Sequence, residues 1–108
     1  MIEKLLTALC QGDYLGMAAL FSRDCRYFDY CPLLNGKQGY FVYGREAVEM
    51  FFRNRFVQGH FEAASPKAED SRTGSFFGSY DGPFVFARLR IEELDGDGLI
   101  RRVTVCPA

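Results

Sequence analysis

Apolar and polar positions in the first twenty residues recur with helical spacing. Residues 2–11 place apolar side chains three or four positions apart, with charged and polar residues between them, which is typical of a helix with one buried face. Gly12 favours the end of this helix, and Asp13 is a good cap for another. A second apolar stripe follows over residues 14–21. The pattern predicts two short helices joined as a helical hairpin.

From residue 25 the period changes to two, which indicates a strand. One face of this strand would carry Cys25, Tyr27, Asp29 and Cys31. The other face would carry Arg26, Phe28 and Tyr30. Pro32 has no backbone N–H to donate, so the strand should end there. Residues 33–43 contain Asn35-Gly36 and Gly39, and we interpret them as an excursion or a short hairpin.

The remaining pattern predicts one long helix over residues 45–57, followed only by strands. The strands are expected at residues 60–64, 73–80, 83–94 and 99–106, with a bulge or edge at Pro66 and turns at 81–82 and 95–98. Helices gathered on one side of such a sheet give an α+β fold. We expect a single domain, residues 1–108, in which helices pack on a strongly curved, mostly antiparallel sheet that encloses a pocket.

Aromatic residues are the main departure from an ordinary composition. The 108 residues include eleven Phe and six Tyr but no Trp. So many rings either pack a small core efficiently or line an apolar cavity, and the sequence leaves both interpretations open.

Charge and hydropathy exclude several classes of partner. The net charge is −1 with no long run of Lys or Arg, so nucleic acid is not an expected partner. The longest apolar stretches are too short to cross a bilayer, and Met1 leads into an amphipathic helix rather than a signal-type segment. We therefore expect a cytoplasmic protein without a membrane partner.

The four cysteines include no C-x-x-C pair, so neither a metal site nor another cofactor is expected. Cys25 and Cys31 would lie on the order of 20 Å apart along one strand, too far for a disulfide. Free buried thiols fit this spacing and a reducing compartment.

Asp29 is the leading candidate for chemistry, because it lies in the middle of an aromatic strand. A carboxylate among rings would pair with an arginine such as Arg26 or Arg45, orient a ligand, or act as a general base with a raised pKa. His60, the only histidine, could complete an acid–base pair with it. The candidate ligand-binding residues are Tyr27, Tyr43, Phe52, Phe56, Tyr80 and Arg102.

An ordered set of motifs runs through the chain. They are Gly12-Asp13, Ala19-Leu20-Phe21-Ser22 with Asp24, Phe28-Asp29, Gly44-Arg45-Glu46-Ala47-Val48 and Phe51-Phe52. This set resembles the nuclear-transport-factor-2-like superfamily, and its SnoaL-like and ketosteroid-isomerase-like members are most similar. The resemblance covers nearly the whole chain. It implies a cystatin-like α+β cone with an apolar cavity, often dimeric through the outer face of the sheet.

The resemblance also places Asp29 at the general-base aspartate of ketosteroid-isomerase-like members, just before a proline-containing loop. The two oxyanion-hole donors of those enzymes do not carry over, since Leu5 and Arg90 fall at or near their positions. Without such donors an enolate loses its main electrostatic stabilisation. Classical ketosteroid isomerase activity is therefore not expected, whereas proton transfer by Asp29 stays open.

These observations favour a small-molecule-binding homodimer whose pocket takes an apolar or aromatic ligand. Two alternatives remain. One is an isomerase-, hydratase- or cyclase-type enzyme that uses Asp29 as a general base on a cyclic ketone or polyketide-like substrate. The other is a non-catalytic dimeric interaction domain whose cavity is filled by its own phenylalanines.

Overall fold

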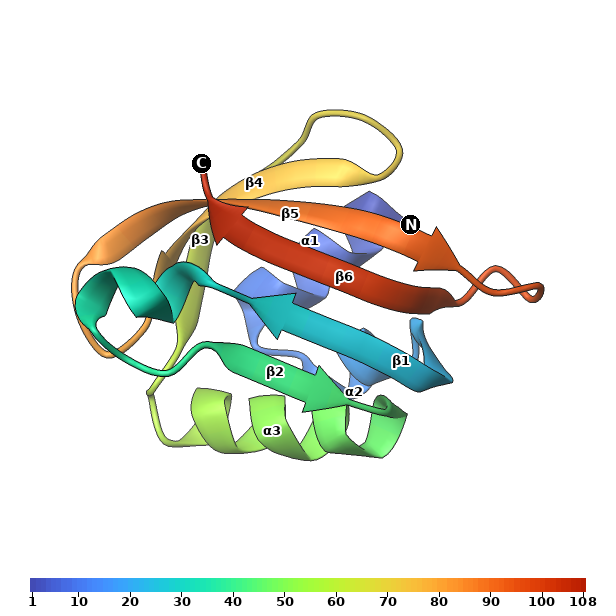
Figure 1. The fold of residues 1–108 in the computed structure, drawn as a ribbon, viewed down its shortest axis with the longest axis horizontal. Helices are drawn as coiled ribbons and strands as arrows, with labels where there is room; N and C mark the ends of the chain where they lie inside the picture. The colour runs from blue at the N-terminus through green and yellow to red at the C-terminus, as the bar shows by residue number, and fades with distance from the viewer.

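The computed structural model describes residues 1–108 as a six-stranded sheet with helices on one face (Figure 1). The elements are α1 (Ile2–Gln11), α2 (Tyr14–Ala18), β1 (Phe21–Asp29), the 3₁₀ helix η1 (Cys31–Asn35), β2 (Tyr40–Tyr43), α3 (Arg45–Val57), β3 (Glu62–Ala68), β4 (Thr73–Ser79), β5 (Phe84–Leu94) and β6 (Ile100–Pro107). The strand order is β2-β1-β6-β5-β4-β3. Only β1 and β6 are parallel neighbours. The predicted α+β fold with a curved, mostly antiparallel sheet is confirmed.

The helices divide the sheet into an inner and an outer face. Helix α1 packs against β3 and α2, while α3 packs against β1, β2 and α2. In Figure 1, α1 and α2 lie behind the sheet and α3 lies below it, but no helix lies in front of β1, β6 and β5. Side chains follow this division, since Leu89 and Val103 are fully buried on the inner face and Arg90 is exposed on the outer one. The outer face has no cover within the chain.

The ends of the first two helices follow local signals only in part. Gly12 adopts a left-handed φ of 69° and ends α1, and the Asp13 carboxylate caps α2 as predicted. The predicted second helix is too long, because Phe21 begins β1. The N–H of Ile100 donates to the carbonyl oxygen of Leu20 at 2.8 Å, and Phe21 pairs with Ile100. Pairing with a distant strand therefore outweighs the local helical pattern.

The first strand is displaced from its predicted bounds of residues 25–31. It ends at Asp29, because the N–H of Cys31 donates to the Asp29 carboxylate and Pro32 has no N–H to donate. The predicted excursion begins with the 3₁₀ helix η1 and returns as β2, which pairs with β1 as a hairpin. The predicted inner face is confirmed, since Cys25, Tyr27 and Asp29 are all buried.

The third helix and the later strands lie close to their predictions. Helix α3 covers residues 45–57 as expected. Strand β3 starts two residues later than predicted and runs further, to Ala68. Ser65 has a φ of 53° and the pairing with β4 shifts around it, so the bulge predicted at Pro66 is confirmed.

The interior of the cone is filled by aromatic rings. The central rings belong to Tyr27, Tyr40, Phe52, Phe61, Phe76 and Tyr80, and they are between 0% and 7% exposed. Their centroids lie 4.8–6.4 Å from neighbouring rings, the usual range for packed aromatic pairs. Of the two interpretations of the aromatic excess, the structure supports a packed core.

The larger pockets lie outside this core. Five surface pockets have volumes of about 270–450 Å³, and none is lined by a ring of the core or by Asp29. All four cysteines are free; Cys25 and Cys31 are buried as predicted, whereas Cys10 is half-buried and Cys106 is exposed. No group of three His, Cys, Asp or Glu side chains is placed to hold a metal ion. No helix has the length and hydropathy needed to cross a membrane.

Candidate functional site

Asp29 is a fully buried carboxylate and the C-terminal residue of β1. The hydroxyl of Tyr80 donates to its Oδ2 at 2.5 Å, and the backbone N–H of Cys31 donates to its Oδ1 at 2.9 Å. None of the ion pairs in the protein involves Asp29. Arg26 lies on the opposite face of β1, and Arg45 donates to the carbonyl of Phe21. The hypothesis of an arginine partner for Asp29 is therefore wrong.

Burial controls the acidity of this group. Desolvation raises the pKa of Asp29 to about 6, although the hydrogen bonds from Tyr80 and Cys31 pull the pKa down. Burial, with the Asp29 charge next, also raises the pKa of Tyr80 far above its ordinary value. Tyr80 thus stays protonated and remains a donor, while Asp29 exchanges its proton close to neutral pH. A group with such a pKa can accept a proton from a weak carbon acid or hydroxyl.

A second tyrosine hydroxyl lies in the same buried region. The Oη atom of Tyr27 is inaccessible and has no hydrogen-bond partner. Burial raises the pKa of Tyr27, and the charge of Asp29 is the next cause. Tyr40 lies nearby, with a pKa raised to about 12 by burial. The centre of the core therefore holds an ionisable carboxylate, a bonded hydroxyl and an unbonded hydroxyl.

His60 is not brought together with Asp29. Its Nδ1 atom lies 2.8 Å from Oδ1 of Asp81, and its side chain is 43% exposed. The connection to the buried carboxylate is indirect, because Asp81 follows Tyr80 in the chain. Lys37 joins the same place, with its Nζ donating to the carbonyl oxygens of Tyr80 at 2.8 Å and Asp81 at 3.0 Å. His60 therefore holds a turn at the surface in this structure.

The other candidate residues separate into two groups. Tyr27, Phe52 and Tyr80 belong to the buried core that contains Asp29. Phe56 packs against Phe52, with 5.6 Å between their ring centroids. Tyr43 and Arg102 lie exposed on the outer face instead. Tyr43 and Arg102, predicted as ligand-binding residues, therefore lie on the opposite side of the sheet from Asp29, and a ligand inside the cone would not contact them.

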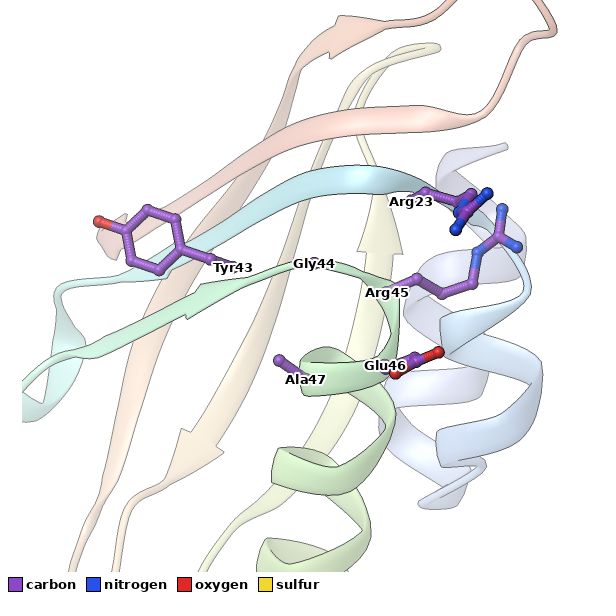
Figure 2. Close-up of a pocket in the computed structure, with 6 residues that line it drawn as sticks. All are labelled: Arg23, Tyr43, Gly44, Arg45, Glu46 and Ala47. Atoms are coloured by element: carbon purple, nitrogen blue, oxygen red, sulfur yellow. The ribbon is translucent and has the colours of Figure 1, made fainter.

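The largest of the five pockets, about 450 Å³, lies at the start of α3 (Figure 2). It is lined by Arg23, Tyr43, Gly44, Arg45, Glu46 and Ala47. Figure 2 shows the side chains of Arg23 and Arg45 close together, with Tyr43 pointing away from them. This pocket is separate from Asp29 and shares no residue with its surroundings.

The role of Tyr80 as the partner of Asp29 was not predicted from the sequence. Alternation along β4 provides a signal that could have found it. Phe76, Gly78 and Tyr80 fall on one side of the period-two pattern. Because Phe76 is large and apolar, this side is the one expected to face the core, and Tyr80 would face it too. The pairing partner across 51 residues of sequence could not be read from any local pattern.

Comparisons with known proteins identify the fold. No family model matches the chain, and no curated protein matches it. Among solved structures, a SnoaL-like protein of unknown function from Burkholderia thailandensis is 12% identical, with a TM-score of 0.60, covering 99% of this chain and 90% of its own. A putative ketosteroid isomerase from Kribbella flavida is 19% identical, with a TM-score of 0.61 and coverages of 98% and 73%.

A third similar structure shows that similarity of fold does not identify an activity. A de novo designed protein with a curved β-sheet is 17% identical, with a TM-score of 0.61, covering 99% of this chain and 81% of its own. Other similar structures are described as NTF2-like and cystatin-like. The chain therefore has the cone fold expected from its motifs. Because a designed protein matches equally well, the fold alone does not assign an activity.

Proposed function

We propose that this chain, with its nuclear-transport-factor-2-like cone fold, is an interaction domain that forms a homodimer through the outer face of its sheet. The proposal is carried by the aromatic side chains exposed on that face. They are Tyr30, Phe41, Tyr43, Phe77, Phe84 and Phe86, which are 37–62% exposed. Single exposed apolar residues are common, but clustered ones on an uncovered face indicate an interface.

The exposed rings, together with the half-buried ring of Phe28, form two patches. The β1–β2 patch consists of Phe28, Tyr30, Phe41 and Tyr43, whose neighbouring ring centroids lie 5.4–5.6 Å apart. The β4–β5 patch consists of Phe77, Phe84 and Phe86, and the rings of Phe77 and Phe86 are 4.9 Å apart. In the strand order, β6 lies between the two patches. The outer face therefore has apolar sides and a middle formed by β6.

A second copy of the chain fits this arrangement. A two-fold axis parallel to the central strands would place the β1–β2 patch of one protomer on the β4–β5 patch of its partner. At about 200 Å² per ring, the six exposed rings present roughly 550 Å², against about 800 Å² per partner in a standard interface. Arg26 and Arg102 form no ion pair within the chain and can meet the partner's Glu92 on the same face.

Light scattering coupled to gel filtration tests this proposal. The wild type should have twice the mass of the 12.3 kDa chain, and Phe86→Arg should reduce it to the mass of a monomer. Met50→Arg is the matched control, because Met50 is 62% exposed on α3, away from the outer face. A monomeric wild type, or a dimer that Phe86→Arg leaves intact, would overturn the proposal.

A second candidate function is proton transfer or ligand binding at Asp29. It is supported by a buried carboxyl with a pKa of about 6 beside the unpartnered hydroxyl of Tyr27. In this role Asp29 would remove a proton next to a carbonyl, and Tyr27 would donate to the oxygen that becomes negative. This donor replaces those missing at Leu5 and Arg90, of which the first is a buried apolar residue and the second is exposed.

Isotope exchange tests the second candidate. The protein is incubated in deuterated buffer with a cyclic ketone, and incorporation of deuterium beside the carbonyl is followed by NMR. The wild type should accelerate the exchange and Asp29→Asn should not. Equal exchange rates in the two proteins would exclude Asp29 as a base for this substrate class.

A further inference from the structure

We infer that the Tyr80 side chain occupies a binding position for a phenol, and that the turn after β4 gates this position. The inference goes beyond the dimer. It deepens the second candidate function and rests on its premise that the interior around Asp29 can accept a small molecule. It names both the ligand class and the part of the chain that would have to move.

Tyr80 enters the core from a turn and not from a strand. Strand β4 ends at Ser79, and Tyr80 is nevertheless 1% exposed. Its ring lies 5.0 Å from that of Phe61 and 5.4 Å from that of Tyr40, and its hydroxyl donates to Asp29. The side chain therefore sits in the core as a phenol, with rings on its sides and a carboxylate at its hydroxyl end.

The backbone before this ring is shaped to admit it. A Cβ atom on Gly78 would lie 2.9 Å from the Tyr80 ring and 3.0 Å from the ring of Phe76. Only glycine leaves the ring this space. After the ring, Asp81 has a φ of 61°, which is uncommon for a residue with a side chain. The ring is thus carried by a short, sharply bent segment between β4 and β5.

Polar contacts at and just below the surface hold that segment in place. We call them the latch: Nζ of Lys37 donates to the carbonyl oxygens of Tyr80 and Asp81, and His60 contacts the Asp81 carboxylate. The side chains of His60 and Asp81 are 43% and 44% exposed. Contacts of this kind stabilise little and can be exchanged for water. Releasing the latch would let the turn withdraw Tyr80 without breaking a strand pair.

If Tyr80 moved out, the side chains that it contacts in the core would determine which class of ligand can replace it. Oδ2 of Asp29 would lose its donor, and the rings of Tyr40 and Phe61 would lose an aromatic neighbour. A neutral aromatic molecule with a hydroxyl donor restores both interactions, whereas an aromatic carboxylate would be repelled by Asp29. The unpartnered hydroxyl of Tyr27 offers a further contact. A phenol with a small substituent opposite its hydroxyl, such as p-cresol, reproduces the Tyr80 side chain.

Two probes and one variant test the site. Tyr80→Ala removes the internal occupant, and p-cresol is compared with toluene, which has the same ring and methyl group but no hydroxyl. Binding is measured by chemical-shift titration. The variant should bind p-cresol about tenfold more tightly than toluene, the ratio expected for one hydrogen bond to a charged acceptor. Equal affinity for the two probes would overturn the assignment of a phenol site.

The gate is tested with Tyr80 present, which also covers the case in which Tyr80→Ala does not fold. Lys37→Met releases the latch, and Lys67→Met is the control because Lys67 is exposed and forms no ion pair. Lys37→Met should bind p-cresol at least threefold more tightly than the wild type and Lys67→Met. No gain in Lys37→Met would overturn the gate. Neither result depends on dimerisation or on turnover of a ketone, so these proposals can fail separately.

Discussion

The buried carboxyl of Asp29 should make the protein less stable as the pH rises from 4 to 7. Its pKa is about 6 in the folded protein against an ordinary value of 3.8. Because the folded state binds this proton more tightly than the unfolded chain, its contribution to stability is complete below pH 3.8. That contribution is lost as the pH rises through about 6. A shift of about two pKa units corresponds to roughly 3 kcal/mol.

Asp29→Asn isolates this effect. The Asn carbonyl can accept from the N–H of Cys31. Its NH₂ group can donate to the Tyr80 hydroxyl oxygen, which reverses that hydrogen bond and leaves the Tyr80 proton without its acceptor, a cost that does not change with pH. Relative to the wild type, the variant should gain about 2–2.5 kcal/mol in unfolding free energy between pH 4 and pH 7, because the unfolded carboxyl is still partly protonated at pH 4. Urea denaturation followed by circular dichroism measures this difference at each pH, with the protein concentration held constant because dimerisation would also change stability.

Glu62→Gln provides the control, since Glu62 is an exposed carboxyl on β3. Its stability difference from the wild type should change little over the same range. If the difference between Asp29→Asn and the wild type stays constant within about 0.5 kcal/mol from pH 4 to pH 7, the linkage relation leaves no room for a raised pKa. The proposed consequence of burial would then be wrong.

Three further substitutions test the Asp29 site, the aromatic core and the start of α3. Tyr80→Phe removes a hydrogen bond that lowers the pKa of Asp29, so the pKa should rise above about 6 in an NMR titration of the carboxyl carbon. Phe52→Ala empties the centre of the ring cluster and should reduce the unfolding free energy by about 3–5 kcal/mol in urea. Gly44→Ala should cost about 1–3 kcal/mol because Gly44 has a φ of 94°, whereas Gly96→Ala, in open space, should be nearly neutral.

Local signals were enough to predict most of the elements. Gly12 and Asp13 separate the first two helices by their own backbone and side-chain preferences. The alternation through Tyr27 and Asp29 places both on the inner face. Helix α3 has its predicted bounds because its N- and C-terminal signals and its apolar stripe agree. The parts of the fold that depend on nearby residues were therefore accessible from the sequence.

Pairings between distant residues were not accessible in this way. Phe21 joins a strand because Ile100 lies beside it, although the local pattern favours a helix. Asp29 meets Tyr80 across 51 residues, and His60 meets Asp81 rather than Asp29. A one-dimensional pattern gives the face on which a side chain lies, but not which residue from another strand or loop arrives there. The composition of the candidate site consequently required the structure.

The retention of a carboxylate in this core is itself informative. Its burial corresponds to roughly 3 kcal/mol against the folded state at neutral pH, a cost that a neutral asparagine of the same size would not carry. A core that served only for packing has no use for an ionisable group held by just two hydrogen bonds, from Tyr80 and Cys31. Dimerisation would use the outer face of the sheet, whereas Asp29 lies on the inner face, so neither role constrains the residues of the other. A dimer on the outer face and a gated site around Asp29 are therefore compatible in one chain, and Asp29 is the residue that dimerisation does not explain.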